Sequence, residues 1–124
     1  MFGVALAPSP VPPSAPLGLR AAPGSSIGSI DLTWNAPLSD GMHAITGYDI
    51  YRGTKSGAET LVAQVGPTTT SFTDTGLTSL TTYYYDVTAI NPIEGPPSNE
   101  ACAVPYPSTT ALPCSPLVTV APPR

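Results

Sequence analysis

Few side chains in this sequence could perform acid–base or nucleophilic chemistry. The candidates are the single histidine, three of the aspartates and the two cysteines: His43, Asp40, Asp74, Asp86, Cys102 and Cys114. General acid–base and nucleophilic catalysis need a base within hydrogen-bond reach of the group that it activates. His43 follows the turn residue Gly41, so we expect it to be a solvated loop residue. The chain has no second histidine that could complete a metal site, and no elbow motif presents a nucleophilic serine.

The aspartates do not form a recognisable pair of catalytic carboxylates. Asp40 and Asp74 stand in turn contexts, where aspartate is favoured because its carboxylate bonds to the local backbone. Asp86 falls on the outward-facing positions of an expected strand, away from the core. The sequence therefore predicts no catalytic, cofactor-binding or metal-ligating residue, and no enzyme activity.

Two cysteines, Cys102 and Cys114, leave two alternatives open. A disulfide between them would close a loop of about a dozen residues and stabilise the fold by about 3 kcal/mol. Such a disulfide favours an oxidising compartment. The alternative is two unpaired thiols, one of them a small buried residue in a strand.

The charge balance and the absence of a long apolar run argue against two classes of partner, nucleic acid and the membrane interior. The formal net charge is -4, with four basic residues against eight acidic ones. Phosphate binding needs a basic patch, so nucleic acid is not an expected partner. No apolar run approaches the roughly 20 residues that a membrane-spanning helix requires, so we expect no membrane insertion.

Proline, glycine and short apolar alternations indicate an all-β domain with extended ends. The chain has 17 Pro and 11 Gly, and strand signals recur every 8 to 12 residues, roughly the spacing of a β-sandwich. In one segment Ile30, Leu32 and Trp34 share a face, which points Trp34 inward. We expect a Pro-rich arm or linker over residues 1–16, the domain over 17–105, and a second Pro-rich arm or linker over 106–124.

Three consecutive tyrosines mark the most informative strand. Period two turns Tyr83 and Tyr85 inward and Tyr84 outward. Tyr85 is expected in the core beside Trp34. The Tyr83 phenol needs a hydrogen-bond partner as it becomes buried. Leu77, six residues earlier, is at a spacing that suits a tyrosine corner, in which the hydroxyl bonds to the backbone near that leucine.

These segments together resemble a fibronectin type III domain over about residues 16–105. The resemblance is carried by PLGLRAAPG, IDLTWNAP, ITGYDIYRG, TSFTDTGL, LTSLTTYYYDVTAIN and EGPPSNEACAVP. Leu80 departs from the pattern, because the family usually has glycine or another small turn residue there. Ser79 likewise stands where proline is common.

The resemblance implies a seven-stranded, immunoglobulin-like Greek-key sandwich that offers loops and edges to partners and has no built-in active site. The family's Arg-Gly-Asp adhesive signal is absent from the loop at 91–97. Carbohydrate binding would need Tyr51, Tyr84 and Tyr106 to form one flat platform. Aromatic residues on a sheet surface are more commonly structural, so carbohydrate binding is unsupported.

Two functions remain. The first is a non-enzymatic structural protein, a subunit on a virion or cell-surface filament whose terminal arms bind other copies or a surface scaffold. A single module that opens at Met1 favours this function. The alternative is an accessory or spacer module of a larger secreted polysaccharide-degrading enzyme, with the Pro-rich ends as linkers. Either function is expected outside the cell, or on a virion surface.

Overall fold

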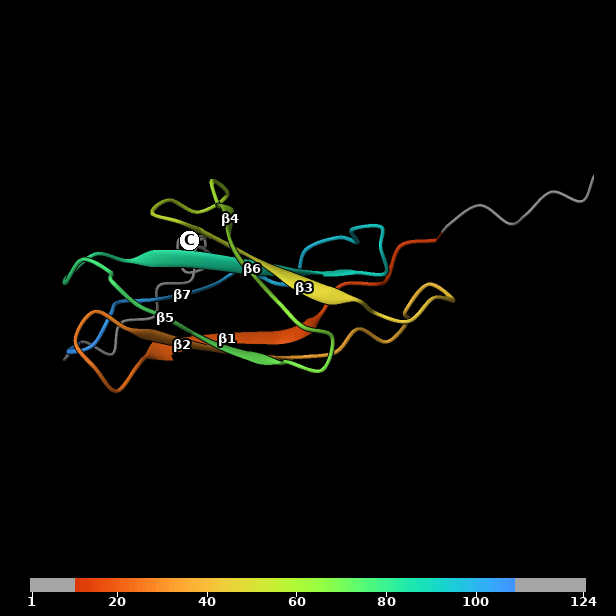
Figure 1. Ribbon diagram of the computed structural model, residues 1–124. Helices are drawn as coiled ribbons and strands as arrows, with labels where there is room; N and C mark the ends of the chain where they lie inside the picture. The colour runs from red at the N-terminus through yellow and green to blue at the C-terminus, as the bar shows by residue number, and fades with distance from the viewer. Residues whose placement is uncertain (1–10, 109–124) are drawn as a thin grey trace, which may run out of the picture.

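The computed structural model describes residues 11–108, and within that range it consists of β-strands joined by turns and loops (Figure 1). The seven strands are β1 Leu17–Pro23, β2 Ile30–Asn35, β3 Gly47–Gly53, β4 Thr60–Val65, β5 Ser71–Asp74, β6 Tyr83–Ile90 and β7 Ala101–Ala103. The predicted all-β sandwich is confirmed. No helix in the described range is long and apolar enough to cross a membrane.

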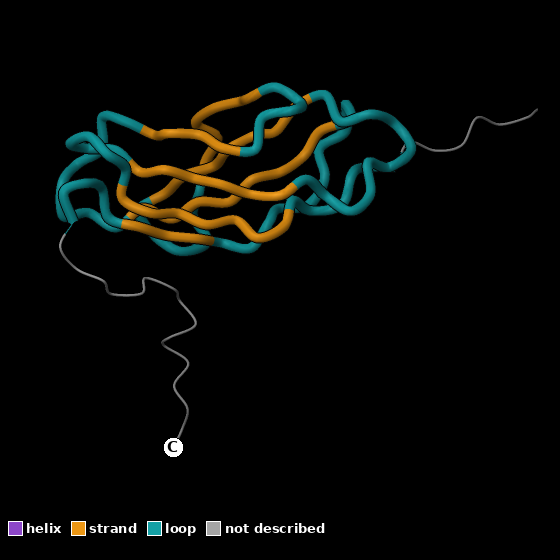
Figure 2. The backbone as a smooth tube through the Cα atoms, turned by 90° about the horizontal axis from the view of Figure 1, so that it is seen from below, coloured by secondary structure: helices purple, strands orange, loops and turns teal. Residues whose placement is uncertain are grey.

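The strands form two sheets that lie face to face (Figure 1). One sheet has the order β1-β2-β5, and the other has the order β4-β3-β6-β7. Neighbouring strands pair antiparallel throughout. Figure 2 shows that the described chain enters the sandwich at one end and leaves it at the opposite end.

Period-two alternation decides which side chains fill the space between the sheets. In β2, Ile30, Leu32 and Trp34 are buried and the intervening residues are exposed. In β6, Tyr83 and Tyr85 are buried, while Tyr84 between them is partly exposed. Among residues 11–108, the buried apolar side chains of the core are those of Leu19, Ile30, Leu32, Trp34, Tyr48, Ile50, Tyr83, Tyr85, Val87, Ala89 and Ala103. The run of three tyrosines is thus divided between the two faces of one strand.

The ring packed against Trp34 differs from our expectation. Tyr48 of β3 meets Trp34 edge to face, with 5.5 Å between the ring centroids. We expected Tyr85 in that place. Tyr85 is fully buried, and its hydroxyl donates a hydrogen bond of 2.7 Å to Asp74 Oδ2. Burial and this bond raise the pKa of Tyr85 well above its usual range.

Asp74 connects the two sheets by polar contacts. It ends β5 in the three-stranded sheet, whereas its partners Arg52 and Tyr85 belong to β3 and β6 of the other sheet. Arg52 Nη1 donates to Asp74 Oδ1 at 3.1 Å and to Oδ2 at 2.9 Å. The Arg52 guanidinium also lies 5.7 Å from the centre of the Tyr83 ring. The prediction of a local turn role is therefore wrong for Asp74.

Tyr83 closes the connection between β5 and β6. Its hydroxyl accepts a hydrogen bond of 2.9 Å from the Thr78 backbone N–H, one residue after Leu77. Leu77 N–H donates to the Gly28 carbonyl at 3.0 Å, which ties the same connection to the β1–β2 turn. A tyrosine corner of this kind satisfies a buried phenol and a loop N–H together.

Asn99 joins the sheets on the side where β1 and β7 approach each other. Its side-chain oxygen accepts from Leu19 N–H, and its amide nitrogen donates to the Leu19 carbonyl, both at 2.9 Å. The side chain of Asn99 therefore satisfies both backbone groups of Leu19, as a paired strand residue would. This contact uses the side of β1 that is not paired with β2.

Residues 11–16, which we placed in the N-terminal arm, pack onto the domain. Pro13 and Pro16 are fully buried, and Ser14 N–H donates to the Ser39 carbonyl at 2.9 Å. Asn91 Nδ2 donates to the Val11 carbonyl at 2.8 Å. At the other end, Tyr106 N–H donates to the Ser29 carbonyl at 3.0 Å. Both ends of the described chain are thus held by the sandwich.

Leu80 should limit stability because of its backbone conformation. Its φ of 65° lies in the left-handed region, and its side chain is 87% exposed. We expect Leu80→Gly to raise the free energy of unfolding by about 0.5–1 kcal/mol, since relief of the left-handed strain exceeds the entropy that glycine adds to the unfolded chain. Urea denaturation measures the change. Leu38 is equally exposed and has no positive φ, so a gain of the same size in Leu38→Gly would contradict this explanation.

The Asp74 contacts should stabilise the fold through their donors. Asp74→Ala leaves Arg52 and the buried Tyr85 hydroxyl without their acceptor, and we expect a loss of about 3 kcal/mol. Tyr85→Phe removes one hydrogen bond and should cost about 1–1.5 kcal/mol. A double-mutant cycle by chemical denaturation tests the coupling. Additive losses in Asp74→Ala/Tyr85→Phe would show that the two side chains do not stabilise each other.

Candidate functional site

The outer face of the four-stranded sheet carries most of the chain's acidic residues. Along β3 and β6, residues that alternate with the core point to this face, and they include Asp49, Tyr51, Tyr84 and Asp86. Three further acidic residues come from the adjoining loops and line the same surface: Glu59, Glu94 and Glu100. The cation Arg52 is on the opposite face of β3, bound to Asp74.

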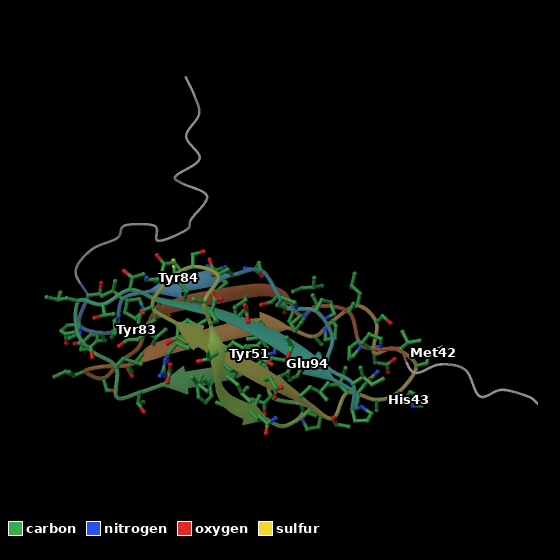
Figure 3. The ribbon with its side chains drawn as sticks, turned by 90° about the horizontal axis from the view of Figure 1, so that it is seen from above. Met42, His43, Tyr51, Tyr83, Tyr84 and Glu94 are labelled. Atoms are coloured by element: carbon green, nitrogen blue, oxygen red, sulfur yellow. The ribbon has the colours of Figure 1, made fainter. Side chains whose placement is uncertain are left out.

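A hollow of about 330 Å³ lies on this face. Its lining is Tyr51, Gly57, Glu59, Asp86, Thr88, Glu94, Gly95 and Pro97. Glu94 Oε2 accepts hydrogen bonds from the Tyr51 hydroxyl and from Thr88 Oγ1, the latter at 2.6 Å. Figure 3 shows Tyr51 and Glu94 close together above β3 and β6. One side of the hollow is therefore preorganised by a carboxylate held between two hydroxyls.

These hydrogen bonds shift the ionisation of the groups that make them. The bond to Glu94, with burial, raises the pKa of Tyr51 to about 12. Bonds from Thr88 and Tyr51 lower the pKa of Glu94. Glu94 is thus a stable anion and hydrogen-bond acceptor rather than a proton donor near neutral pH.

The other side of the hollow holds carboxyl groups that resist ionisation. Burial, a hydrogen bond with Glu100 and nearby negative charge raise the pKa of Glu59 to about 7. Burial and the charges of Glu100 and Glu94 raise the pKa of Asp86 to about 6. Burial alone would also raise the pKa of Glu100, but bonds from Glu59, Ser56 and Gly57 lower it on balance. We expected Asp86 to face away from the core, and it does so within this cluster.

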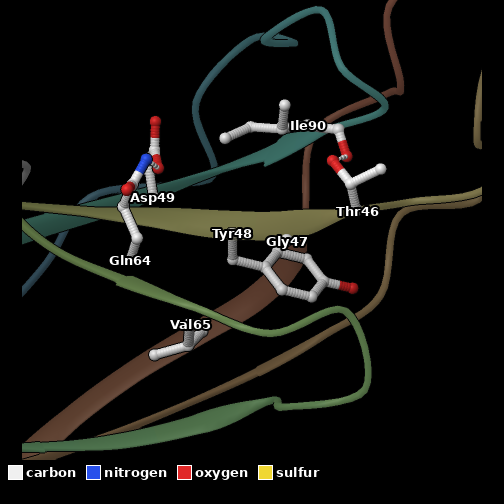
Figure 4. Close-up of a pocket in the computed structure, with 7 residues that line it drawn as sticks. All are labelled: Thr46, Gly47, Tyr48, Asp49, Gln64, Val65 and Ile90. Atoms are coloured by element: carbon white, nitrogen blue, oxygen red, sulfur yellow. Dashed lines mark hydrogen bonds between the residues drawn. The ribbon is translucent and has the colours of Figure 1, made fainter.

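A second hollow, of about 250 Å³, lies where β3 begins (Figure 4). Its lining is Thr46, Gly47, Tyr48, Asp49, Gln64, Val65 and Ile90. Gln64 Nε2 donates to Asp49 Oδ1 at 2.7 Å, and Thr46 Oγ1 donates to the Ile90 carbonyl at 3.1 Å. A Cβ at Gly47 would lie 2.7 Å from the Val65 carbonyl oxygen, so β4 passes too close for a side chain there. These polar groups already bind one another.

The structure separates the residues that the sequence offered for chemistry. His43 is exposed beside Met42 at one end of the sandwich (Figure 3). Asp40 makes the local contact we expected, because its Oδ1 accepts from Met42 N–H at 2.9 Å. Asp74 is buried between the sheets. Within residues 11–108, no group of three or more His, Cys, Asp or Glu could hold a metal ion.

The three tyrosines that a flat carbohydrate platform would require come from both sides of the sandwich. Tyr51 and Tyr84 share the outer face of the four-stranded sheet. Tyr106 follows β7, and its backbone bonds to Gly28 and Ser29, which lead into β2 of the other sheet. Cys102 lies in β7 opposite Tyr84, whereas Cys114 is outside the described residues. The Cys102–Cys114 disulfide stays a prediction.

The sequence did not predict that Glu59, Glu94 and Glu100 would come together. Glu59 is far along the chain from Glu94 and Glu100, and all three lie in segments between strands, where acidic residues are ordinary. The period-two alternation along β3 and along β6 could have indicated that Tyr51 and Asp86 point to the outer face. Nothing local to the sequence indicates which loop carboxylates cover that face.

Comparison with known proteins identifies the family. The family model for the fibronectin type III domain matches residues 14–103. The chain belongs to the fibronectin type III family. Its fold also resembles the crystal structure of a Fn3-like protein from Clostridium thermocellum, with a TM-score of 0.65 and 36% identity over 79% of this chain and 98% of that one.

Other relatives contain a fibronectin type III domain as a small part. Exoglucanase B of Cellulomonas fimi is 45% identical over 83 residues, which are 66% of this chain and 7% of the relative. Poly(3-hydroxybutyrate) depolymerase of Ralstonia pickettii is 36% identical over 103 residues, 82% of this chain and 18% of the relative. The matched fibronectin type III domain is non-catalytic.

The carboxyl cluster on this fibronectin type III domain should make stability depend on pH. Since the pKa of Asp86 rises from 3.8 to about 6 on folding, its unfolded form loses the proton first. The contribution of protonated Asp86 to the stability of the folded state is therefore complete below pH 3.8 and is lost as pH rises through about 6. In Asp86→Asn, the fall in the free energy of unfolding between low and neutral pH should be smaller by on the order of 1 kcal/mol, after allowance for partial solvent screening.

Denaturant unfolding at pH 4 and pH 7, on the wild type and Asp86→Asn, checks this expectation. The wild type should be less stable at pH 7 than at pH 4, and the difference should be smaller in the variant. Asp31 is exposed on the other sheet and bonds to Thr73, so Asp31→Asn is a control with the same change of charge. A wild type that is more stable at pH 7 would contradict the role of the cluster.

Proposed function

We propose that this chain is a non-catalytic accessory module of a larger extracellular polymer-degrading enzyme, and that it holds neighbouring parts of that enzyme apart. The observation that supports this most directly is the small share of each relative that the chain covers, 7% of Exoglucanase B and 18% of Poly(3-hydroxybutyrate) depolymerase. A β-1,2-glucanase from Parabacteroides distasonis also contains a similar fold, at 26% identity, a TM-score of 0.61 and 14% of that chain.

The way the chain enters the domain fits a spacer. Residues 11–16 are bound to the turn at 39–41 and to the loop at 91–95, both at the same end of the sandwich. Gly41 and Gly95 have no room for a Cβ, which would lie 2.1 Å from the Val11 carbonyl oxygen and 2.2 Å from that of Pro13. Because residues 11–16 are packed so closely against these two loops, the orientation of the chain where it enters the domain is fixed.

The way the chain leaves the domain supports the same function. The Tyr106 carbonyl accepts from Gly28 N–H at 2.7 Å, which fixes the chain at the end opposite to the entry (Figure 2). A module with fixed entry and exit at opposite ends sets both the separation and the direction of whatever is joined to it.

The comparisons favour this function over the virion or filament subunit that we weighed from the sequence. Most of the segments expected to act as assembly arms, 1–16 and 106–124, falls in residues 1–10 and 109–124, which lie outside the described residues. Their contacts with other copies stay a prediction. Carbohydrate binding by the module stays untested.

The mass and location of the native polypeptide test the proposal. Antibodies against residues 11–108 should detect, in the culture medium, a polypeptide several times heavier than the 12.7 kDa of this chain. Light scattering should show the isolated chain as a monomer at all concentrations. A native product of about 12.7 kDa that sediments with particles or filaments would support the structural subunit and overturn the accessory module.

A further inference from the structure

The loop between β3 and β4, residues 54–59, is held across the outer face by one carboxylate. Ser56 Oγ donates to Glu100 Oε1 at 2.7 Å, and Gly57 N–H donates to Glu100 Oε2 at 2.9 Å. Glu100 immediately precedes β7, on the far side of β6 from the loop. Both oxygens of one side chain therefore attach the loop to the opposite part of the sheet.

The loop is also compact within itself. Ala58 N–H donates to the Lys55 carbonyl at 3.1 Å, which closes a turn. A Cβ at Gly53 would lie 2.5 Å from the Ala58 carbonyl oxygen, so the two ends of the loop are in contact. The loop can therefore move as a unit when its bonds to Glu100 break.

Glu59 is placed against the same carboxylate. Its side chain forms a hydrogen bond with Glu100, although both groups are carboxyls. Two carboxyl groups can share a hydrogen bond only when one of them carries a proton. The Oε2 atom of Glu59 is buried, and no backbone N–H, hydroxyl or basic side chain among the described residues donates a hydrogen bond to it, which opposes a charge on this side chain.

The charged groups around this pair are mostly of the same sign. Asp86 faces Glu59 and Glu100 from β6, and Glu94 acts on Asp86 from the loop before β7. Lys55, in the loop itself, is exposed. The ion pair found within residues 11–108 is Arg52–Asp74, on the other face of the sheet. No described cation is paired with the Glu59–Glu100 contact.

We propose that Glu59 and Glu100 form a proton-operated latch for the loop at 54–59. With a shared proton, the loop stays bound to Glu100 and covers one side of the 330 Å³ hollow. Without the proton, Glu59, Glu100 and Asp86 repel one another, and the loop leaves the face. The hollow then widens, because Gly57 and Glu59 belong to its lining.

The direction of the pH dependence follows from Glu59. In the closed loop, burial and the hydrogen bond with Glu100 raise the pKa of Glu59 from its ordinary value of 4.5 to about 7, and opening the loop removes both causes. Because the closed loop binds the proton more tightly, the proton favours the closed loop over the open one. This preference is complete below pH 4.5 and is lost as pH rises through about 7. Across this interval the equilibrium between closed and open loop should shift by up to roughly 10²-fold towards the open form.

Hydrogen exchange of the Gly57 amide, followed by NMR, measures this opening because that N–H is bound to Glu100 only in the closed loop. After correction for the intrinsic pH dependence of exchange, the wild type should lose at least about tenfold of its Gly57 protection between pH 4.5 and pH 7.5. Core amides of β6 serve as the reference for global unfolding. Unchanged Gly57 protection would overturn the latch.

Two variants and one control separate the latch from a general effect of charge. In Glu59→Gln the amide Nε2–H donates to Glu100 at every pH, so Gly57 protection should change by no more than a few-fold. Ser56→Ala removes one bond to Glu100 and should lower protection at pH 4.5 while keeping the loss at higher pH. Asp31→Asn makes the same charge change on the other sheet and should behave as the wild type. A full wild-type response in Glu59→Gln, or a flattened response in Asp31→Asn, would contradict the proposal.

Discussion

The buried carboxylate of Asp74 constrains the arrangement of both sheets. Removing a carboxylate from water costs several kcal/mol unless partners replace its hydration. Arg52 and Tyr85 supply those partners from two strands of the opposite sheet. Because side chains alternate along a strand, a slip of one residue in β3 or β6 would turn Arg52 or Tyr85 to the outer face. The pairing of Arg52 with Tyr85 across β3 and β6 is therefore the register that leaves Asp74 satisfied.

The two faces of the four-stranded sheet treat acidic groups in opposite ways. On the inner face, Asp74 has a cation and a phenol as partners. On the outer face, Glu59, Asp86 and Glu100 are close together without a paired cation, so their protonation can change. A sandwich needs one exact interior but tolerates much variation outside. The outer face is thus where this domain can differ from its relatives without losing the fold.

The fold could be predicted from the sequence to a large extent. Alternation placed Trp34 and Tyr85 in the core, and the spacing from Leu77 to Tyr83 indicated the corner. The candidate site could not be predicted in the same way. Its carboxylates come from β6, from the loop before β4 and from the segment between β6 and β7, and their sequence neighbourhoods resemble ordinary turns. Asp74 was misread for this reason, because a turn signal describes the backbone and not the partners across a sheet.

The sequence by itself determined most of the secondary structure and the inward face of each strand, because both depend on period-two alternation and local turn residues. Its motifs also resembled those of the fibronectin type III family. Tertiary structure decided which polar groups meet. It put Tyr48 rather than Tyr85 against Trp34, and it bound the Pro-rich segment at 11–16 to the sandwich. It also brought Glu59 to Glu100. Such contacts join residues distant in sequence, and their geometry is set only when the two sheets pack.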